Sequence, residues 1–461
     1  MTLDPAALAG WAGGTWDPAP PGRIAGVSND TRTLMAGALY VAIRGPNFDG
    51  HMFVTAAFAR GACGAMVETS FRAGPQAAGP LLRVPDVGVA LRAMARGYRR
   101  AVDPVIVAVT GSAGKSTVKE MIAQCVGGTL PSSCTRGNWN NEIGLPLSML
   151  RMMSGCKAGI FELGTNHPGE IGALAAILEP DWGVVTNIAP AHIENFGTLE
   201  AIAHEKADLL RSLPRDGLAI LDRDGACFEI LQNAVRGPIL TVSLTHPADY
   251  VCRRREPAEC EFEVEERRSG EAVLMKVSQP GEHTVTNALL AIAVARALGI
   301  GWEPLREALA AFAPLPMRWQ RCEAGGLLLI NDAYNANPLS MLAALKTFAE
   351  TPVQGRKWLV LADMLELGAA SDAEHRRLGA LAASGPWRGM ATVGGMGRVI
   401  AEAAADAGFD RSSIFACESN REAAEVVARE TRPGDAVLLK GSRGMRLEEI
   451  AQHLSGMNGR A

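Results

Sequence analysis

The chain has 461 residues, of which 48% are hydrophobic and 20% charged, and its net charge is −4. This composition is typical of a globular protein of about two to four domains. The net charge excludes the overall basic field of a nucleic-acid-binding protein. No stretch of the sequence approaches the roughly 18 to 20 uninterrupted apolar residues that cross a membrane. The nine cysteines include no Cys-x-x-Cys pair, and the stretch "MTLDPAALAGWAGG" lacks the basic start and apolar core of a secretory signal, so we expect a reduced, cytoplasmic protein.

The N-terminal part of the chain combines short strand patterns with one helical pattern. "GALYVAI" and "GAMVE" have the apolar, β-branched character of strands and are separated by glycine-rich turns. "GHMFVTAAFARGA" has helical spacing. The sequence predicts a small α/β domain over residues 1–102.

The central part contains four strongly apolar strand candidates, "VIVAVT", "AGIFEL", "GVVTNI" and "LAILD", with helical patterns between them. Such alternation predicts a parallel sheet that helices cover on both faces. An antiparallel excursion around "CRRREPAECEFEVEE" and an Ala-rich helix in "HTVTNALLAIAVARALG" follow. We predict a central P-loop-like ATPase domain over residues 103–313.

The last part begins after the proline-rich "FAPLPMRWQ", which is typical of a domain boundary. Strand candidates "RKWLVLAD", "GMATVGG" and "DAVLLKGSRG" alternate with helical patterns, and a terminal helix is expected from about Met445. We predict a Rossmann-like α/β domain over residues 314–461. The predicted fold class is therefore α/β with three domains.

The segment "TGSAGKST" joins a predicted strand to a predicted helix. Gly111 and Gly114 would let backbone N–H groups approach an anion at the helix N-terminus, and Lys115 would add a full positive charge. Phosphate is the ligand that this pattern favours. The two glycines are closer together than in a standard P-loop, so a simple strand-to-helix turn remains the alternative.

Polar residues follow the predicted strands directly. In open α/β sheets ligands bind at the carboxyl ends of the strands, which here carry Gly111, Glu162, Asn187, Asp363 and Lys440. Burial of the Glu162 carboxylate would be costly unless a cation or a hydrogen-bond donor compensates it. We therefore consider Glu162 a candidate ligand for magnesium. His192 follows another strand end and could complete a cation site, and the alternative is an ordinary loop histidine.

Nine motifs in one order together resemble the Mur ligases. They are "TGSAGKST", "GNWNNEIG", "FELGTNHPGEI", "NIAPAHIENFG", "HEKADLL", "GEHTVTNALLA", "NDAYNANP", "LADMLELG" and "LKGSRG". Within that family they most resemble the ligases that join D-alanyl-D-alanine to UDP-N-acetylmuramoyl-tripeptide through an acyl phosphate, in peptidoglycan precursor synthesis. The resemblance implies that the short glycine loop holds the phosphates of ATP.

The resemblance also implies the roles of particular residues. Catalysis would rest on Lys115, Glu162, His192, Lys206 and Arg318. Mg²⁺ would be held by Ser116, Glu162, His192 and a CO2-derived carbamate on Lys206. ATP would be bound by Gly111, Ser112, Ala113, Gly114, Lys115, Ser116, Thr117, His283, Asn287, Arg318, Asp332 and Tyr334.

The substrates implied by the resemblance are small molecules. The UDP-tripeptide would be bound by Ser28, Thr31 and Arg32 in the N-terminal region and by Asn138, Asn140 and Asn141 in the central one. Asn335 and Asn337 would line the site of the incoming dipeptide. We expect a monomer that has no nucleic-acid partner and does not insert into a membrane.

Three alternatives remain open at this point. A sister Mur ligase and a folylpolyglutamate-synthase-like enzyme would share the ATP chemistry, and a nucleotide-dependent switch would bind ATP without ligating anything.

Lys115 and Asn287 precede the proline-rich boundary whereas Arg318 and Asp332 follow it. We therefore expect the C-terminal domain to swing about a hinge near Pro314 to Pro316 when ATP binds.

Overall fold

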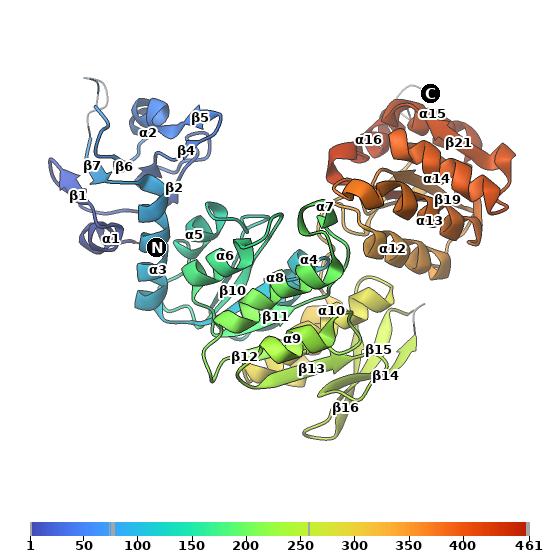
Figure 1. Ribbon diagram of the computed structural model, residues 1–461, viewed down its shortest axis with the longest axis horizontal. Helices are drawn as coiled ribbons and strands as arrows, with labels where there is room; N and C mark the ends of the chain where they lie inside the picture. Colours follow the sequence, from blue (N-terminus) through green and yellow to red (C-terminus); the bar gives the residue numbers. More distant parts are fainter. Residues whose placement is uncertain (1, 73, 75–78, 257–258, 458–461) are drawn as a thin grey trace.

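The computed structural model describes residues 2–72, 74, 79–256 and 259–457, and the strands in these ranges form three main sheets. Each sheet, with its helices, occupies a successive part of the chain, and the N- and C-terminal parts lie on opposite sides of the central one (Figure 1). The predicted three-domain α/β fold class is confirmed. The domain boundaries stay a prediction, and their outer limits, residues 1 and 461, lie outside the described residues.

The N-terminal domain has a five-stranded sheet in the order β1-β7-β6-β3-β2. Only β1 pairs antiparallel, with β7, and the other neighbours are parallel. The strands are β1 (Thr15–Asp17), β2 (Gly26–Ser28), β3 (Ala38–Val41), β6 (Gly64–Glu68) and β7 (Leu81–Val84), and the short hairpin is β4 (Arg44–Gly45) with β5 (Phe48–Asp49). The helices are α1 (Pro5–Ala12), α2 (Val54–Ala59) and α3 (Val87–Val102).

The central sheet has nine strands in the order β16-β15-β14-β13-β12-β11-β8-β10-β9. The run from β14 to β9 is parallel, and β15 and β16 extend it as an antiparallel meander. The strands are β8 (Val105–Thr110), β9 (Ser132–Cys134), β10 (Ala158–Glu162), β11 (Trp182–Val185), β12 (Leu218–Asp222), β13 (Ile239–Ser243), β14 (Tyr250–Glu256), β15 (Glu261–Glu266) and β16 (Glu271–Lys276). The helices are α4 (Lys115–Gly127), α5 (Gly144–Met149), α6 (Glu170–Leu178), α7 (Ile193–Phe196), α8 (Leu199–Ser212), α9 (Phe228–Ala234), α10 (Glu282–Ala297) and α11 (Trp302–Ala310).

The C-terminal sheet has six strands in the order β17-β18-β22-β19-β20-β21. All neighbours are parallel except β17, which pairs antiparallel with β18. The strands are β17 (Gln320–Ala324), β18 (Leu327–Asn331), β19 (Lys357–Ala362), β20 (Trp387–Val393), β21 (Ile414–Cys417) and β22 (Ala436–Lys440). The helices are α12 (Pro338–Glu350), α13 (Ser371–Ala383), α14 (Gly395–Asp406), α15 (Asn420–Glu430) and α16 (Glu448–Met457).

The N-terminal and central domains share one hydrophobic core. Met94 and Tyr98 on α3 belong to the same buried cluster as Leu145 on α5 and Leu174 on α6. Arg99 ties the two domains further, because its guanidinium donates to Asp181 at 2.8 Å. The C-terminal domain instead has two clusters of its own, one on each side of its sheet.

Candidate active site

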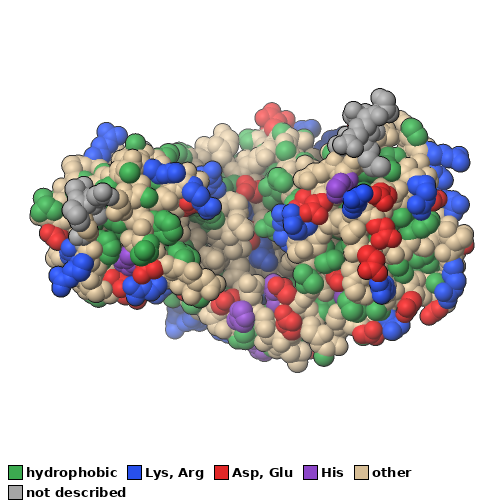
Figure 2. All heavy atoms as spheres, turned by 90° about the horizontal axis from the view of Figure 1, so that it is seen from above, with side chains coloured by type: hydrophobic (Ala, Val, Ile, Leu, Met, Phe, Trp, Pro, Cys, Tyr) green, Lys and Arg blue, Asp and Glu red, His purple; other side chains and the backbone are tan. Residues whose placement is uncertain are grey.

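A cavity of about 680 Å³ lies where the central and C-terminal domains meet. In the space-filling view the molecule is hollowed between its two outer domains (Figure 2). The cavity brings together these predicted site residues: Ser112, Ala113, Gly114, Lys115, Ser116, Thr117, Asn138, Asn140, Asn141, Glu162, His192, His283, Asn287, Arg318, Asp332, Tyr334, Asn335 and Asn337. Carboxyl ends of strands from two sheets thus face one space.

The loop between β8 and α4 is shaped by close contacts that only glycine permits. Gly111 has φ +148°, and a Cβ there would lie 2.0 Å from the Thr186 hydroxyl. Gly114 has φ +79°, and its Cβ would lie 2.9 Å from Oδ1 of Asn287. The loop therefore leads directly into the N-terminus of α4, whose unpaired N–H groups favour an anion.

Side chains after β11 hold this loop in place. The Ala113 N–H donates to Oδ1 of Asn187 at 2.9 Å, and the Ala113 carbonyl accepts from Nδ2 of Asn187 and from the Thr186 hydroxyl. The hydroxyl of Ser112 donates to the Ala189 carbonyl at 2.9 Å. These bonds hold the loop in the conformation that leads into α4.

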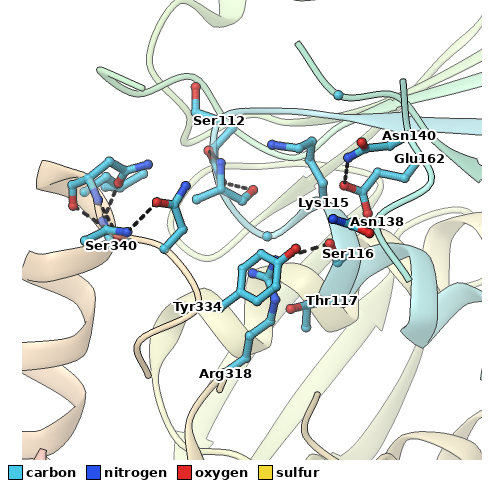
Figure 3. Close-up of a pocket in the computed structure, with 18 of the residues that line it drawn as sticks. Ser112, Lys115, Ser116, Thr117, Asn138, Asn140, Glu162, Arg318, Tyr334 and Ser340 are labelled. Atoms are coloured by element: carbon cyan, nitrogen blue, oxygen red, sulfur yellow. Dashed lines mark hydrogen bonds between the residues drawn. The ribbon is translucent and has the colours of Figure 1, made fainter. Parts of the chain in front are cut away.

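Lys115 brings a positive charge to the wall of the cavity. Its Nζ donates to the Gly111 carbonyl at 2.9 Å, which folds the side chain back over the loop. Desolvation lowers the pKa of Lys115, the Glu162 carboxylate acts in the opposite direction, and the Arg318 cation lowers the pKa further. Figure 3 shows Lys115 and Glu162 on the same side of the cavity.

Glu162 is a buried carboxylate at the end of β10, with 2% of its surface exposed. Oε1 accepts from Nδ2 of Asn140 at 2.7 Å, and the Glu162 N–H donates to the Thr135 hydroxyl at 2.9 Å. Oε2 is buried, and no hydrogen-bond partner for it occurs in the described ranges. A buried carboxylate oxygen without a partner is costly, and a hard cation such as Mg²⁺ would satisfy it.

Thr135 is fixed in turn by a fully buried lysine. Nζ of Lys119 on α4 donates to the Thr135 carbonyl at 2.7 Å and also pairs with Glu120. The N-terminal part of α4 and the carboxylate at the end of β10 are therefore linked through Thr135. This link keeps Glu162 in register with the loop that carries Lys115.

Lys206 on α8 is buried, with 3% of its surface exposed, and it is not among the residues that line the cavity. No hydrogen bond or ion pair to its Nζ occurs in the described part of the chain. Its neighbour Glu205 instead accepts from the Gly169 and Ile171 N–H groups at the start of α6. Desolvation, with a contribution from the Lys115 cation, lowers the pKa of Lys206 to about 7.

His192 lies at the start of α7 and faces the cavity. Its Nδ1 is 2.6 Å from Oε2 of Glu366, which belongs to the C-terminal domain. Burial lowers the pKa of His192, the Glu366 carboxylate opposes this shift, and the Lys115 and Lys206 cations reinforce it. A neutral imidazole is the form that binds metals.

In residues 2–72, 74, 79–256 and 259–457, no group of three or more His, Cys, Asp or Glu side chains could hold a metal ion by itself.

The C-terminal domain closes the opposite wall. Nη2 of Arg318 donates to the Ser116 hydroxyl at 3.2 Å, and its guanidinium stacks 4.2 Å from the centre of the Tyr334 ring (Figure 3). Asp332 accepts from the Trp319 N–H and forms an ion pair of 2.8 Å with Lys440. A cation thus reaches the phosphate loop from across the domain boundary.

The asparagines in "DAYNANP" have structural roles as well. Asn337 begins α12 with a capping box, in which its Oδ1 accepts from the Ser340 N–H at 2.8 Å. Oδ1 of Asn335 accepts from the Ala336 N–H, and the Asn335 carbonyl accepts from Lys440. Oδ1 of Asn141 caps the start of α5.

Several predicted residues lie outside the cavity. Ser28, Thr31 and Arg32 are in the N-terminal domain, where Arg32 is exposed and pairs with Asp30 at 2.9 Å. Gly111 is the first residue of the loop and is not among the residues that line the cavity. Asp363 was expected with the other strand-end residues, but its Oδ1 accepts from the Gly397 N–H at the start of α14.

Residues that the sequence did not mark as site residues also contribute. Lys440 and Asn187 were visible only as strand-end residues, and the structure shows that they hold Asp332 and Ala113. Gln279 lines the cavity and donates to the Arg318 carbonyl at 2.9 Å. Nothing in the sequence around Thr135 marks it as a support for Glu162.

No helix in the described chain is long and apolar enough to span a bilayer.

Three family models match successive parts of the chain. The Mur ligase family catalytic domain matches residues 23–99, the Mur ligase middle domain residues 109–295, and the Mur ligase glutamate ligase domain residues 317–443. The matches follow the order of the three sheets.

Proteins similar over almost the whole length include two UDP-N-acetylmuramoyl-tripeptide–D-alanyl-D-alanine ligases. The one from Bacillus subtilis is 34% identical over 94% of this chain and 93% of its own length. The one from Escherichia coli is 32% identical over 93% of each.

Solved structures agree with these similarities. A crystal structure of MurF from Acinetobacter baumannii has a TM-score of 0.88 at 27% identity and covers 99% of both chains. MurF from Thermotoga maritima in complex with ADP has a TM-score of 0.81 at 25% identity, covering 95% of this chain and 98% of that one. By its relatives, its matched domains and its fold, the chain belongs to the Mur ligase family.

Proposed function

We propose that the protein joins D-alanyl-D-alanine to UDP-N-acetylmuramoyl-tripeptide in peptidoglycan precursor synthesis, with conversion of ATP to ADP and phosphate. One observation carries this proposal above the others. The cavity places a phosphate-type loop, a buried carboxylate with an unpartnered oxygen and an arginine from the next domain around one space. A site that must bring a nucleotide and a carboxylate substrate together needs these three elements.

ATP binds across the domain boundary in this proposal. The N–H groups at the start of α4 and the Lys115 ammonium receive the phosphates, and Arg318 adds a second cation beside Ser116. His283 and Asn287 on α10 contact the adenine, whereas Asp332 and Tyr334 contact the ribose side. All four line the same cavity.

Ser116, Glu162 and His192 would hold Mg²⁺, which would neutralise the charges of the γ-phosphate and the substrate carboxylate. The unpartnered Oε2 of Glu162 and the cavity-facing His192 fit this role. Thr135 and Asn140 keep Glu162 in place, so that its position is set before the substrates bind.

Lys206 carries a carbamate in this proposal. Carbamates form on neutral amines, and at an unperturbed pKa near 10.5 fewer than about one amine in a thousand is neutral at pH 7. Burial and the Lys115 cation bring the pKa of Lys206 to about 7, so a large fraction of its amine is free to react with CO2. The resulting anion would neutralise nearby positive charge in this buried place.

The reaction has two steps. A carboxylate oxygen of the tripeptide attacks the γ-phosphorus in line, and ADP leaves as the acyl phosphate forms. The amine of D-alanyl-D-alanine then attacks the acyl carbon, phosphate leaves with the bridging oxygen, and the amine loses a proton as the amide forms. Lys115 and Arg318 stabilise the charge that moves between the phosphates, so the protein acts mainly by positioning and electrostatics.

The two organic substrates extend away from this centre. Asn138, Asn140 and Asn141 border the cavity on the central domain, and Ser28, Thr31 and Arg32 offer hydroxyls and a guanidinium for the UDP part. Asn335 and Asn337 border the dipeptide site. We also infer a cytoplasmic location, which is supported by nine unpaired thiols: Cys63, Cys125, Cys134, Cys156, Cys227, Cys252, Cys260, Cys322 and Cys417. That the protein is a monomer stays a prediction.

A substrate-dependence assay tests the proposal. Phosphate release from ATP is measured with the UDP-tripeptide alone, with D-alanyl-D-alanine alone and with both. The proposal expects sustained release only with both substrates, matched by an equal amount of amide product. A nucleotide-dependent switch would instead release phosphate without either substrate, and a folate ligase would require a folate and glutamate.

A further inference from the structure

The loop that carries His192 is pressed against the C-terminal domain. Ile193 packs against the buried cluster of the C-terminal domain that contains Leu367, as well as against a cluster of the central domain. Opposite it is the 3-10 helix η2 (Gly368–Ala370), where a Cβ on Gly368 would lie 2.8 Å from Cβ of Glu194. In Figure 1, α7 is the part of the central domain that reaches toward the C-terminal domain.

His192 and Glu366 meet within this contact. Nδ1 of His192 is 2.6 Å from Oε2 of Glu366, an ion-pair distance, and 19% of the His192 side chain is exposed. The angle of this contact is not that of a hydrogen bond, and Nδ1 has no other hydrogen-bond partner among the described residues, so Glu366 is the group that faces this nitrogen. His192 lines the cavity and Glu366 does not, so within the described chain the carboxylate reaches the cavity only through the ring. With Nδ1 beside a carboxylate, Nε2 is the ring nitrogen left for a ligand.

Both residues hold an unfavourable backbone conformation at this contact. His192 has φ +53° and Glu366 has φ +66°, in the left-handed region that non-glycine residues rarely adopt. Such conformations persist where the surroundings over-determine them, and they cluster at functional sites. Two of them facing each other across a domain boundary indicate that the geometry of this pair has a use.

Two cations and one anion act on the imidazole of His192. Lys115 and Lys206 are the cations that act on His192, and Glu366 is the anion that acts on it. A carboxylate on one ring nitrogen holds a metal-binding histidine in the correct tautomer and orientation and makes the other nitrogen a better ligand. Here the two partners of that arrangement come from different domains.

We propose that Glu366 is a positioning residue, which from the C-terminal domain orients His192 of the central domain so that Nε2 faces the metal in the cavity. The inference rests on the proposed function in one respect, namely that His192 is a metal ligand. Its consequence is that the metal site is complete only while the C-terminal domain is docked on α7. Metal binding and domain arrangement are then coupled, because each favours the other.

Binding of Mn²⁺, a paramagnetic substitute for Mg²⁺, tests this inference without turnover. Titration of the nucleotide-free protein with Mn²⁺, followed by electron paramagnetic resonance, gives the affinity. Glu366→Gln, which keeps the shape and removes the charge, is expected to weaken Mn²⁺ binding about tenfold. Glu366→Asp, which keeps the charge, is expected to lose less, and Glu425→Gln, at an exposed ion pair with Arg421 on α15, should bind as the wild type does.

A double-mutant cycle separates positioning from a general structural effect. In the His192→Gln background, Glu366→Gln should cause no further loss, since its effect passes through the ring. Equal Mn²⁺ affinities of Glu366→Gln and Glu425→Gln, or the same loss with and without His192, would overturn the inference. If His192→Gln binds Mn²⁺ as tightly as the wild type does, the inference is overturned too. The ligase function is tested separately, by phosphate release in the presence of both substrates. Unchanged melting temperatures show that each variant is folded.

Discussion

At the start of α4, Lys115 brings a positive charge to the wall of the cavity. It faces the cavity beside Glu162 and Arg318, and its Nζ donates to the Gly111 carbonyl. The sequence predicted the loop and its lysine from glycine, lysine and serine between a strand and a helix, and the order of the other motifs favoured a phosphate loop over a simple turn. The Arg318 contribution to the lowered pKa of Lys115 was not predictable from the local sequence, because Arg318 belongs to the C-terminal domain.

Lys115→Ala should lower kcat at least about a hundredfold, because a charge that stabilises the transferring phosphoryl group is lost. The Gly111 and Ala113 contacts do not depend on this side chain beyond one hydrogen bond, so the melting temperature should change little. Steady-state phosphate release and differential scanning fluorimetry measure the two quantities. Ligation at a normal rate by the variant would remove the ATP-loop assignment.

Lys206→Ala should be nearly inactive if the carbamate is needed, and short carboxylic acids added to the assay should restore part of the activity. The acid would enter the space left by the side chain and supply the missing anion. The control is Lys157→Ala, at an exposed lysine that does not line the cavity. A fully active Lys206→Ala enzyme, or one that no added acid improves, would argue against the carbamate.

At the scale of elements, the strands were predictable and their mutual supports were not. The apolar runs predicted β8, β10, β11, β12, β19 and β22 because parallel strands buried on both faces are continuously hydrophobic. Which side chains would meet at the strand ends depends on strand order, which the local sequence does not encode. Asp363 ends β19 as expected yet caps α14, while Thr135, far from Glu162 in sequence, supports it.

Gly111→Ala should raise the KM for ATP about tenfold or more, because the new methyl group would meet the Thr186 hydroxyl at 2.0 Å and displace the phosphate loop. Gly128→Ala is the matched control, since a Cβ there meets nothing within 4 Å. Initial rates at varied ATP give both KM values. Equal KM values for the two variants would mean that the loop conformation is not what binds the nucleotide.

At the scale of the molecule, the chain consists of one rigid pair of domains and one separate domain. The shared core around α3 makes the N-terminal and central domains one body. The C-terminal domain meets it through Ile193 and through polar contacts, such as the ion pair of 2.6 Å between Lys346 and Glu282 and the Arg318 bond to Ser116. Interfaces of this kind permit relative motion.

The C-terminal domain should therefore swing toward the central one when substrates bind. Small-angle scattering with an ATP analogue and UDP-tripeptide should give a smaller radius of gyration than the free protein gives, because Arg318 and Asp332 then close on the nucleotide. Closure also excludes the water that would hydrolyse an acyl phosphate. Identical scattering curves in both states, from a preparation with measured turnover, would count against the motion.

The most direct measurement follows an oxygen atom through the reaction. UDP-N-acetylmuramoyl-tripeptide labelled with oxygen-18 in its reacting carboxylate is incubated with ATP, Mg²⁺ and D-alanyl-D-alanine, and the released phosphate is analysed by mass spectrometry. If the carboxylate attacks the γ-phosphorus in this cavity, each phosphate carries one labelled oxygen and the other label stays in the new amide. Unlabelled phosphate, with or without amide formation, would contradict the acyl-phosphate ligase.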